Sequence, residues 1–416
     1  MPTVAVIGAG AAGLVAAAFA SAGGAQVVLI ERTKDGGRKI LISGGGRCNV
    51  LPSALAPERF VTDSPSHLLR GMLRAWPLHE QRAFFERDLE IPLALEEESG
   101  KLFPRSNRAR DIRDGLVTYA RAKGVEIRFD TTVTDLSIGA AGFTVSTSGD
   151  EVQCDRVVLA TGGLSVPATG SDGAGLSAAQ RSGHAMVDTY PALTPLLAKG
   201  EVHASLSGVS LDVRLRGRSG SKTIESSGGF LFTHRGYSGP SVLDISHLTE
   251  RGAEPTIRAQ WSTLSPADWG SAFDARSASV ATILNRHIPG RLAEQLMIEA
   301  GVLLDRRTSS FTRSERIRLI EMLTSYPLPW SGNEGYKKAE VTGGGVALSE
   351  VHPKTLESKR VPGLYMCGEM LDAFGPIGGH NFSWAWATGR AAGAGAAAEL
   401  VKTTSVESGF SRTDKR

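Results

Sequence analysis

The chain has 416 residues, of which 41% are apolar and 21% charged, a composition typical of soluble globular proteins. Lys and Arg together number 46 and Asp and Glu 43, so the net charge of +3 gives no general attraction to nucleic acid or to a membrane surface. Three widely spaced cysteines favour a reducing, cytoplasmic setting, and no apolar run approaches the ~18 residues of a spanning helix. The 49 glycines gather in clusters, which suggests that backbone lies close to a ligand.

The N-terminal segment contains the elements of a dinucleotide-binding fold. A short apolar strand, TVAVIG, leads into Gly8, Gly10 and Gly13 in GxGxxG spacing, and a helical segment follows. The next strand, AQVVLIE, ends in Glu31, at the place where this motif carries an acid. A carboxylate there accepts hydrogen bonds from ribose hydroxyls and repels a 2′-phosphate. The segment therefore favours FAD or NAD over NADP.

A glycine-rich, basic segment, GGRKILISGGGRCNV (36–50), follows soon after this acid. NAD-binding domains usually proceed directly into their next helix at this point. We expect Arg38 and Lys39 to neutralise phosphate, and Gly44 and Gly45 to let the backbone lie beside a flat ring. The segment thus favours noncovalent FAD, the alternative being a solvated loop with incidental charge.

Three later segments complete the predicted flavin site. Val133 follows the strand VEIRF, where related folds contact adenine through the backbone. The buried strand RVVLA ends at Thr161 and Gly162. The strand GLYMCGE, with Gly368 and Glu369, precedes GGHN and a closing helix, which would aim Glu369 at the polyol chain and a helix N-terminus at the ring. No metal site is predicted.

The pattern changes at Pro191, where alternating segments such as LDVRLRG and TIRAQW indicate antiparallel strands. We predict an α/β fold, a two-dinucleotide-binding (Rossmann-like) FAD domain with an inserted β-barrel-like domain and a small helical domain. The predicted parts are the FAD-binding domain (1–190 and 341–400), the β domain (191–264 and 327–340), the helical lobe (265–326) and a flexible tail (401–416).

Four motifs together resemble the BaiN/YhiN-like flavoproteins, a family of NAD(P)/FAD-dependent oxidoreductases. They are GAGAAGL, GRKILISGGGRCN, GGFLFTHRGYSGPSVL and AEVTGGGVALSEVHPKTLESKRVPGLYMCGE, and the likeness extends to about residue 400. The resemblance implies FAD contacts at Gly10, Gly13, Glu31, Arg32, Arg38, Lys39, Gly44, Gly45, Asn49, Val133, Glu369 and Asn381. Where this chain has His380, the family often has an aromatic residue.

The first functional hypothesis is an FAD oxidoreductase that passes a hydride between flavin and a small organic substrate. Members of the resembled family are linked to reduction of carbon–carbon double bonds. No second strand–GxGxxG–helix is found, so NAD(P)H would be a transient electron donor that uses the substrate's cleft. The alternatives are a flavoprotein acting on RNA, against which the near-neutral charge and the lack of a basic aromatic stripe count, and a non-catalytic flavin-binding regulator. No nucleic-acid or membrane partner is expected, and the oligomeric state is not predicted.

Candidate catalytic residues come from the inserted segment and one hairpin. His234, Tyr237 and Ser238, in THRGYSGPS, are acid–base candidates, unless their hydroxyls instead cap a helix that begins near Pro240. Arg105, in KLFPRS, is a candidate clamp for a substrate carboxylate, the alternative being a surface arginine on a hairpin.

Overall fold

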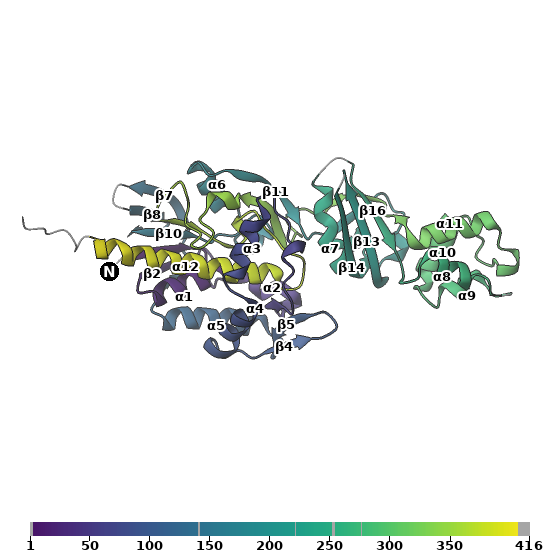
Figure 1. The fold of residues 1–416 in the computed structure, drawn as a ribbon, viewed down its shortest axis with the longest axis horizontal. Coiled ribbons are helices and arrows are strands. Elements are labelled where there is room, and N and C mark those ends of the chain that lie inside the picture. Colours follow the sequence, from purple (N-terminus) through teal and green to yellow (C-terminus); the bar gives the residue numbers. More distant parts are fainter. Residues whose placement is uncertain (1–2, 140–141, 221, 252–253, 276, 407–416) are drawn as a thin grey trace, which may run out of the picture. The chain divides into compact units, whose positions relative to one another are not determined.

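The computed structural model describes residues 3–139, 142–220, 222–251, 254–275 and 277–406. The chain forms two compact units (Figure 1). Unit 1 combines the residues up to Tyr190 with those from Val341 onward, and unit 2 is Pro191–Glu340. None of the described helices is long and apolar enough to cross a membrane.

Unit 1 is built on a parallel sheet of five strands in the order β20-β10-β1-β2-β6. The neighbouring strands pair in parallel throughout, and the predicted Rossmann-type strands are confirmed. Buried apolar residues fill β1, β2, β10 and β20, as expected for a parallel sheet with both faces covered. The strands are β1 (Thr3–Ile7), β2 (Gln26–Ile30), β6 (Glu126–Arg128), β10 (Arg156–Leu159) and β20 (Leu364–Met366).

Two helices of unit 1, α1 (Ala11–Ala22) and α12 (His380–Val406), pack backbone against backbone and run side by side in Figure 1. A Cβ atom added at Gly389 would lie 2.4 Å from the Ala12 carbonyl oxygen, and one added at Gly393 would lie 2.1 Å from that of Ala16. The small residues of both helices therefore allow the close approach. α12 is helical to Val406, within the predicted tail 401–416, and 407–416 lie outside the described residues.

Smaller elements complete unit 1. Two three-stranded antiparallel sheets and one two-stranded sheet accompany the parallel sheet. The helices are α2 (Arg38–Ile42), α3 (Ser66–Arg74), α4 (Leu78–Ala83), α5 (Ala109–Ala122) and α6 (Ala174–Arg181). The strands are β3 (Leu51–Pro52), β4 (Leu93–Glu96), β5 (Lys101–Pro104), β7 (Val133–Gly139), β8 (Gly142–Thr147), β9 (Glu151–Cys154), β11 (Met186–Ala192) and β19 (Val341–Val346).

Unit 2 contains a seven-stranded antiparallel sheet in the order β17-β16-β13-β14-β15-β12-β18. In the described residues its two edge strands are not paired with each other, so the predicted barrel-like closure is not confirmed. Helix α7 (Pro240–Ile245) packs on this sheet. The strands are β12 (Leu196–Ala198), β13 (Ser210–Ser219), β14 (Lys222–Phe232), β15 (Gly236–Ser238), β16 (Thr256–Gln260), β17 (Tyr326–Pro327) and β18 (Trp330–Asn333).

Four further helices of unit 2 lie within the predicted helical lobe. Two begin with a capping box, Ser265 with Asp268 and Thr312 with Glu315, which satisfies N–H groups that a helix start leaves unpaired. Their buried side chains belong to the same hydrophobic cluster as those of the sheet, so the lobe and the sheet share one core. The helices are α8 (Pro266–Ala272), α9 (Val280–Leu284), α10 (Gly290–Glu299) and α11 (Arg313–Thr324).

Candidate nucleotide-binding site

Glu31 lies directly after β2, at the carboxyl edge of the parallel sheet, and is 9% exposed. Its Oε2 accepts a hydrogen bond of 2.8 Å from the backbone N–H of Ala9, within the glycine turn. Its Oε1 accepts from the backbone and hydroxyl of Thr33, at 2.8 and 2.7 Å. These bonds fix the carboxylate between two loops, while its remaining lone pairs are available to the hydroxyls of a ribose.

The glycine turn between β1 and α1 is shaped as the motif predicts. Gly8 has a left-handed φ of 102°, and a Cβ on Gly13 would lie 1.8 Å from the Gly8 carbonyl oxygen. Gly10 is the N-cap of α1, and a Cβ there would meet nothing within 4 Å. The turn thus leaves open space beside a helix N-terminus, an arrangement that suits a phosphate.

The segment after α2 has an unusual run of left-handed residues. Gly44, Gly45 and Gly46 have φ of 55°, 67° and 85°, and Cys48 follows with 66°. The Asn49 side chain folds under this turn, where its Oδ1 would lie 2.7 Å from a Cβ on Gly44. Within the described residues that buried oxygen has no hydrogen-bond partner. An acceptor held in this way fits a ligand that supplies an N–H or O–H donor.

Lys39 and Glu369 meet at the centre of the predicted site. Lys39 Nζ lies 2.5 Å from Glu369 Oε2 and 2.6 Å from Ser165 Oγ. Ser165 in turn donates to Glu369 Oε1 at 2.5 Å, and the Thr342 backbone N–H donates to the same oxygen at 3.0 Å. The Thr342 hydroxyl accepts from the Leu164 and Ser165 backbones. Three segments distant in sequence from Glu369 therefore hold its carboxylate in place.

Sequence reasoning did not identify Ser165 or Thr342. Both lie beside glycine clusters, in ATGGLS and EVTGGG, and that proximity is the only signal that the sequence offered. Arg113 was also missed. Its side chain, 8% exposed, donates to the Asp35 carbonyl at 3.1 Å and fills the space beside Gly37, so it supports the loop before α2.

Arg32 and Arg38, the two arginines predicted to contact FAD, form ion pairs with carboxylates of the protein. Arg38 Nε lies 3.1 Å from Asp35 Oδ1, and Arg32 pairs with Asp172. Burial acts to raise the pKa of Asp35, but Arg38 and Arg113 outweigh it and lower that pKa below its usual value. In this structure the guanidinium charges are thus partly neutralised by the protein itself.

The remaining predicted ligands surround the same edge of the sheet. Asn381, at the start of α12, accepts from the Gly375 N–H at 2.8 Å and donates to the Gly375 carbonyl at 2.9 Å. Gly368 donates to the Thr388 hydroxyl and accepts from Trp384 Nε1, which fixes the turn that carries Glu369. The buried Thr161 hydroxyl, like Asn49 Oδ1, lacks a partner among the described residues. Gly162 has a φ of 74°, and Val133 begins β7 half-buried.

Taken together, unit 1 fits the nucleotide that the sequence predicts. An oriented carboxylate, an open glycine turn at a helix N-terminus, and orphaned polar atoms near left-handed glycines are features that a bound dinucleotide would satisfy.

The catalytic candidates of unit 2 are not brought together. Tyr237 is fully buried in the core, where its hydroxyl donates to the Pro329 carbonyl at 3.1 Å and lies 2.9 Å from His203 Nδ1. Burial raises its pKa, so the phenol stays neutral and faces the protein interior. A buried hydroxyl that bonds within the core stabilises the fold, and this position disfavours the predicted acid–base role of Tyr237. His234 is exposed, and Ser238 is half-buried.

The structure bears on the two alternatives named for these residues, a helix cap before Pro240 and a surface position for Arg105. Helix α7 begins at Pro240 after Gly239, with no side-chain cap, so the predicted capping hydroxyls are not observed. Arg105 is exposed just after β5, as expected of a surface arginine on a hairpin.

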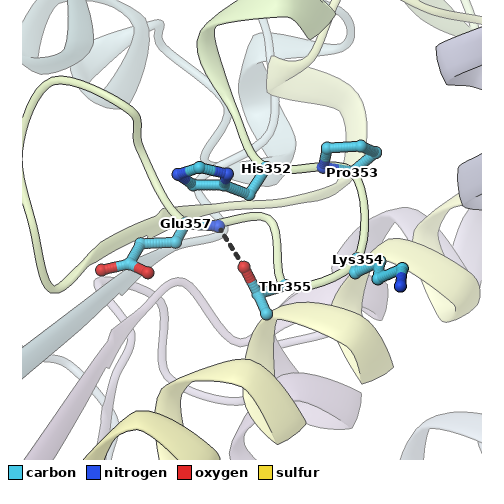
Figure 2. Close-up of a pocket in the computed structure, with 5 residues that line it drawn as sticks. All are labelled: His352, Pro353, Lys354, Thr355 and Glu357. Atoms are coloured by element: carbon cyan, nitrogen blue, oxygen red, sulfur yellow. Dashed lines mark hydrogen bonds between the residues drawn. The ribbon is translucent and has the colours of Figure 1, made fainter.

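A separate hollow of about 460 Å³ lies in the loop before β20 (Figure 2). His352, Pro353, Lys354, Thr355 and Glu357 line it, and the Glu357 backbone donates to the Thr355 hydroxyl at 3.4 Å. None of these residues belongs to the predicted flavin set.

Comparison with known proteins assigns the family. The model of the HI0933-like protein Rossmann domain matches residues 2–395. The chain belongs to this family. The predicted resemblance to the BaiN/YhiN-like flavoproteins, and with it membership of a family of flavin-dependent oxidoreductases, is confirmed.

Relatives with named activities align over almost the whole chain. The ribosomal RNA dihydrouridine synthase of Escherichia coli is 34% identical over 92% of this chain and 95% of the relative. The 3-dehydro-bile acid delta(4,6)-reductase of Clostridium scindens is 32% identical over 95% of this chain and 99% of the relative. The fold also resembles the crystal structure of 3-ketosteroid-delta4-(5alpha)-dehydrogenase from Rhodococcus jostii RHA1, with a TM-score of 0.51, 16% identity, and coverage of 95% of this chain and 96% of that one.

Proposed function

We propose that this chain binds FAD noncovalently in unit 1 and reduces a carbon–carbon double bond of an organic substrate, with NAD(P)H as the electron donor. The observation that carries the proposal is the convergence on one sheet edge of the oriented Glu31, the open turn at Gly10 and the Lys39–Glu369 pair. A bound flavin would supply the hydride. The protein's own residues bind and orient it.

Each group has a proposed task in this site. Glu31 would bind the ribose hydroxyls, and the turn at Gly10 the pyrophosphate. Glu369 would bind the polyol chain, oriented by Ser165 and Thr342. Asn49 and the segment Gly44–Gly46 would lie beside the ring. Among the catalytic candidates, His234 and Ser238 remain proposed proton donors, whereas Tyr237 would be structural.

The names of the relatives support the type of substrate. By its name, a delta(4,6)-reductase of a 3-dehydro-bile acid acts on double bonds of a ketone-bearing substrate, and dihydrouridine is uridine with two hydrogens added to a ring double bond. In both cases the alkene is conjugated to a carbonyl group, which makes it an acceptor for hydride. We therefore expect an alkene conjugated to a carbonyl.

Rapid mixing under anaerobic conditions tests the proposal. NADH or NADPH should bleach the flavin absorbance, and a cyclic enone should restore it. In the described residues only one parallel sheet with a glycine turn is present, so donor and acceptor are expected to use one cleft in turn. Parallel double-reciprocal lines would follow from that order, whereas intersecting lines would indicate a second nucleotide site. Flavin that neither nicotinamide reduces would contradict the proposed donor.

A second candidate function is reduction of a uracil base within RNA. The 34% identity to a named ribosomal RNA dihydrouridine synthase, over nearly the full length of both chains, favours it. It differs from the expectation, drawn from the near-neutral charge and the lack of a basic aromatic stripe, that nucleic acid is not a partner. Turnover of an RNA transcript, measured as dihydrouridine by mass spectrometry, distinguishes this candidate from a small-molecule reductase.

A further inference from the structure

Four arginines gather on the outward side of the unit 2 sheet. In β13, Val213 and Leu215 are buried, whereas Arg214, Arg216 and Arg218 are exposed at alternate positions. Arg258, on the neighbouring strand β16, is also exposed and pairs in register with Arg216. We call these four residues the arginine face. The alternation in VRLRGR, which looks like ordinary strand patterning in the sequence, places three guanidinium groups on one side.

Carboxylates balance only part of the charge of this face. Arg216 is 68% exposed and forms an ion pair of 3.7 Å with Glu225, the residue directly opposite it on β14. Among the described residues no ion pair involves Arg214, and Arg258 donates instead to the Ser325 carbonyl at 2.9 Å. Asp212 and Glu225 are the only acids at the outward positions of β13, β14 and β16.

Fold stability explains only part of the arrangement, because the Arg216–Glu225 pair is favourable whereas the Arg216–Arg258 pair is not. Arg216 and Arg258 are directly opposite each other across an antiparallel pair, and like charges in that position destabilise a sheet. On the inward side of the sheet, Gly217 packs tightly against apolar side chains. A Cβ added there would lie 2.2 Å from Leu248 Cδ1. The inward side is thus closely packed, and the outward side carries repulsion that a bound polyanion would relieve.

We infer that the arginine face binds the sugar–phosphate backbone of RNA, an inference that rests on the second candidate function. Alternate residues of a strand repeat about every 7 Å, which presents guanidinium groups as a row along an extended backbone. Arginine binds phosphate through two parallel hydrogen bonds. No aromatic residue occupies an outward position of these three strands, so the contacts are with phosphate and carry little sequence preference.

An RNA partner is favoured over an anionic membrane. Surfaces that insert into a membrane need apolar or aromatic side chains next to their basic residues. Of the outward residues on β13, β14 and β16, only Leu231 is a large exposed apolar side chain, at 37%. The face is therefore charged without an apolar anchor.

The test compares the full-length holoprotein with two triple variants of equal charge change. R214Q/R216Q/R258Q removes three of the four arginines of the face and leaves Arg218, and R70Q/R87Q/R181Q removes three exposed arginines of unit 1. Binding of a short fluorescein-labelled single-stranded RNA is measured by anisotropy over a range of salt concentrations. Loss of three phosphate contacts should reduce the slope of log affinity against log salt by about 2, at ~0.7 per contact. Flavin content and enone reduction should stay at the wild-type level.

The outcomes distinguish failure of the arginine face from failure of the second candidate function, reduction of a uracil base within RNA. A reduced slope for R214Q/R216Q/R258Q alone supports the arginine face. Equal slopes for both variants, with RNA still bound by the wild type, overturn the face and leave the RNA-base candidate intact. A wild-type protein that binds no RNA overturns both, while flavin reduction by NAD(P)H would still support the proposed reductase. Arginine-dependent binding to phosphatidylglycerol vesicles, without RNA binding, would assign the face to a membrane and contradict the inference.

Discussion

The ammonium group of Lys39 lies 2.5 Å from the carboxylate of Glu369, although the two residues are 330 positions apart in the chain. Both side chains are largely shielded from solvent, with exposures of 27% and 16%. The pair joins the start of α2 to the turn after β20, the two segments that the proposed flavin site needs together.

Replacing Glu369 with Gln should weaken FAD binding roughly 10- to 100-fold, because a charge-assisted hydrogen bond contributes about 1.5–3 kcal/mol. The variant would also leave Lys39 without its counter-charge. Fluorescence titration of FAD into apoprotein measures the effect, with the exposed Glu97→Gln as the matched control. Equal affinities for Glu369→Gln and the control would contradict the proposed polyol contact.

Glu31→Lys should lose most of its FAD, since a cation forfeits the ribose hydrogen bonds and also those from Ala9 and Thr33. Glu31→Gln should keep a larger share, because an amide oxygen still accepts. The ratio of flavin to protein absorbance after gel filtration reports the result, and Glu98→Lys, at an exposed position, controls for the charge change. A colourless wild-type protein that binds NAD but not FAD would overturn the flavin interpretation of residues 36–50.

Cys48→Ser should retain FAD and its reducibility. The thiol is completely buried, and burial raises its pKa to about 12, so it stays protonated and unreactive at neutral pH. Native protein should therefore resist iodoacetamide at this position, as judged by mass spectrometry of the labelled peptides. Loss of turnover in Cys48→Ser with its FAD intact would instead indicate a redox thiol.

His380→Phe should make folding less sensitive to acid. Burial, together with the charge of Arg59, lowers the pKa of His380 to about 4 from an ordinary 6.5. Between these values the unfolded chain binds a proton that the folded chain does not, so the free energy of unfolding falls as pH drops from 6.5 toward 4. From pH 7 to pH 5, protonation of His380 in the unfolded chain lowers the free energy of unfolding by about 2 kcal/mol.

Urea unfolding of wild type and His380→Phe at these two pH values isolates that contribution. The buried His247, whose pKa is also lowered to about 4, is unchanged in both proteins and cancels in the comparison. Identical pH sensitivity of the two proteins would mean that folding does not lower the pKa of His380.

The nucleotide half of the site could be predicted because its chemistry is local. Gly8, Gly13 and Glu31 belong to one strand–helix–strand unit, where spacing alone fixes their positions. Thr342 and Ser165 are different, since they meet across 177 positions and no local pattern links them.

In unit 2, alternation of polar and apolar residues predicted the strands but not the contacts of each side chain. The pattern around Tyr237 and Arg216 indicated strands, and strands are present. In β13 the apolar residues Leu211, Val213 and Leu215 mark the inward side, whereas β15, with three residues, is too short to show one. Tyr237, an acid–base candidate in the sequence, faces the core, and the arginines of β13 face outward.

The backbone contact between α1 and α12 has a consequence for the order in which the protein is made. β20 and α12 leave the ribosome after all of unit 2, so unit 2 has its complete sequence while α1 still lacks the helix that covers it. Glu369 arrives with the same late segment, whereas Glu31 and Lys39 are made near the beginning. If Glu369 contacts the flavin as proposed, the complete site forms only after this late segment is made, and until then the nascent nucleotide unit exposes the surface of α1 to chaperones or to other chains.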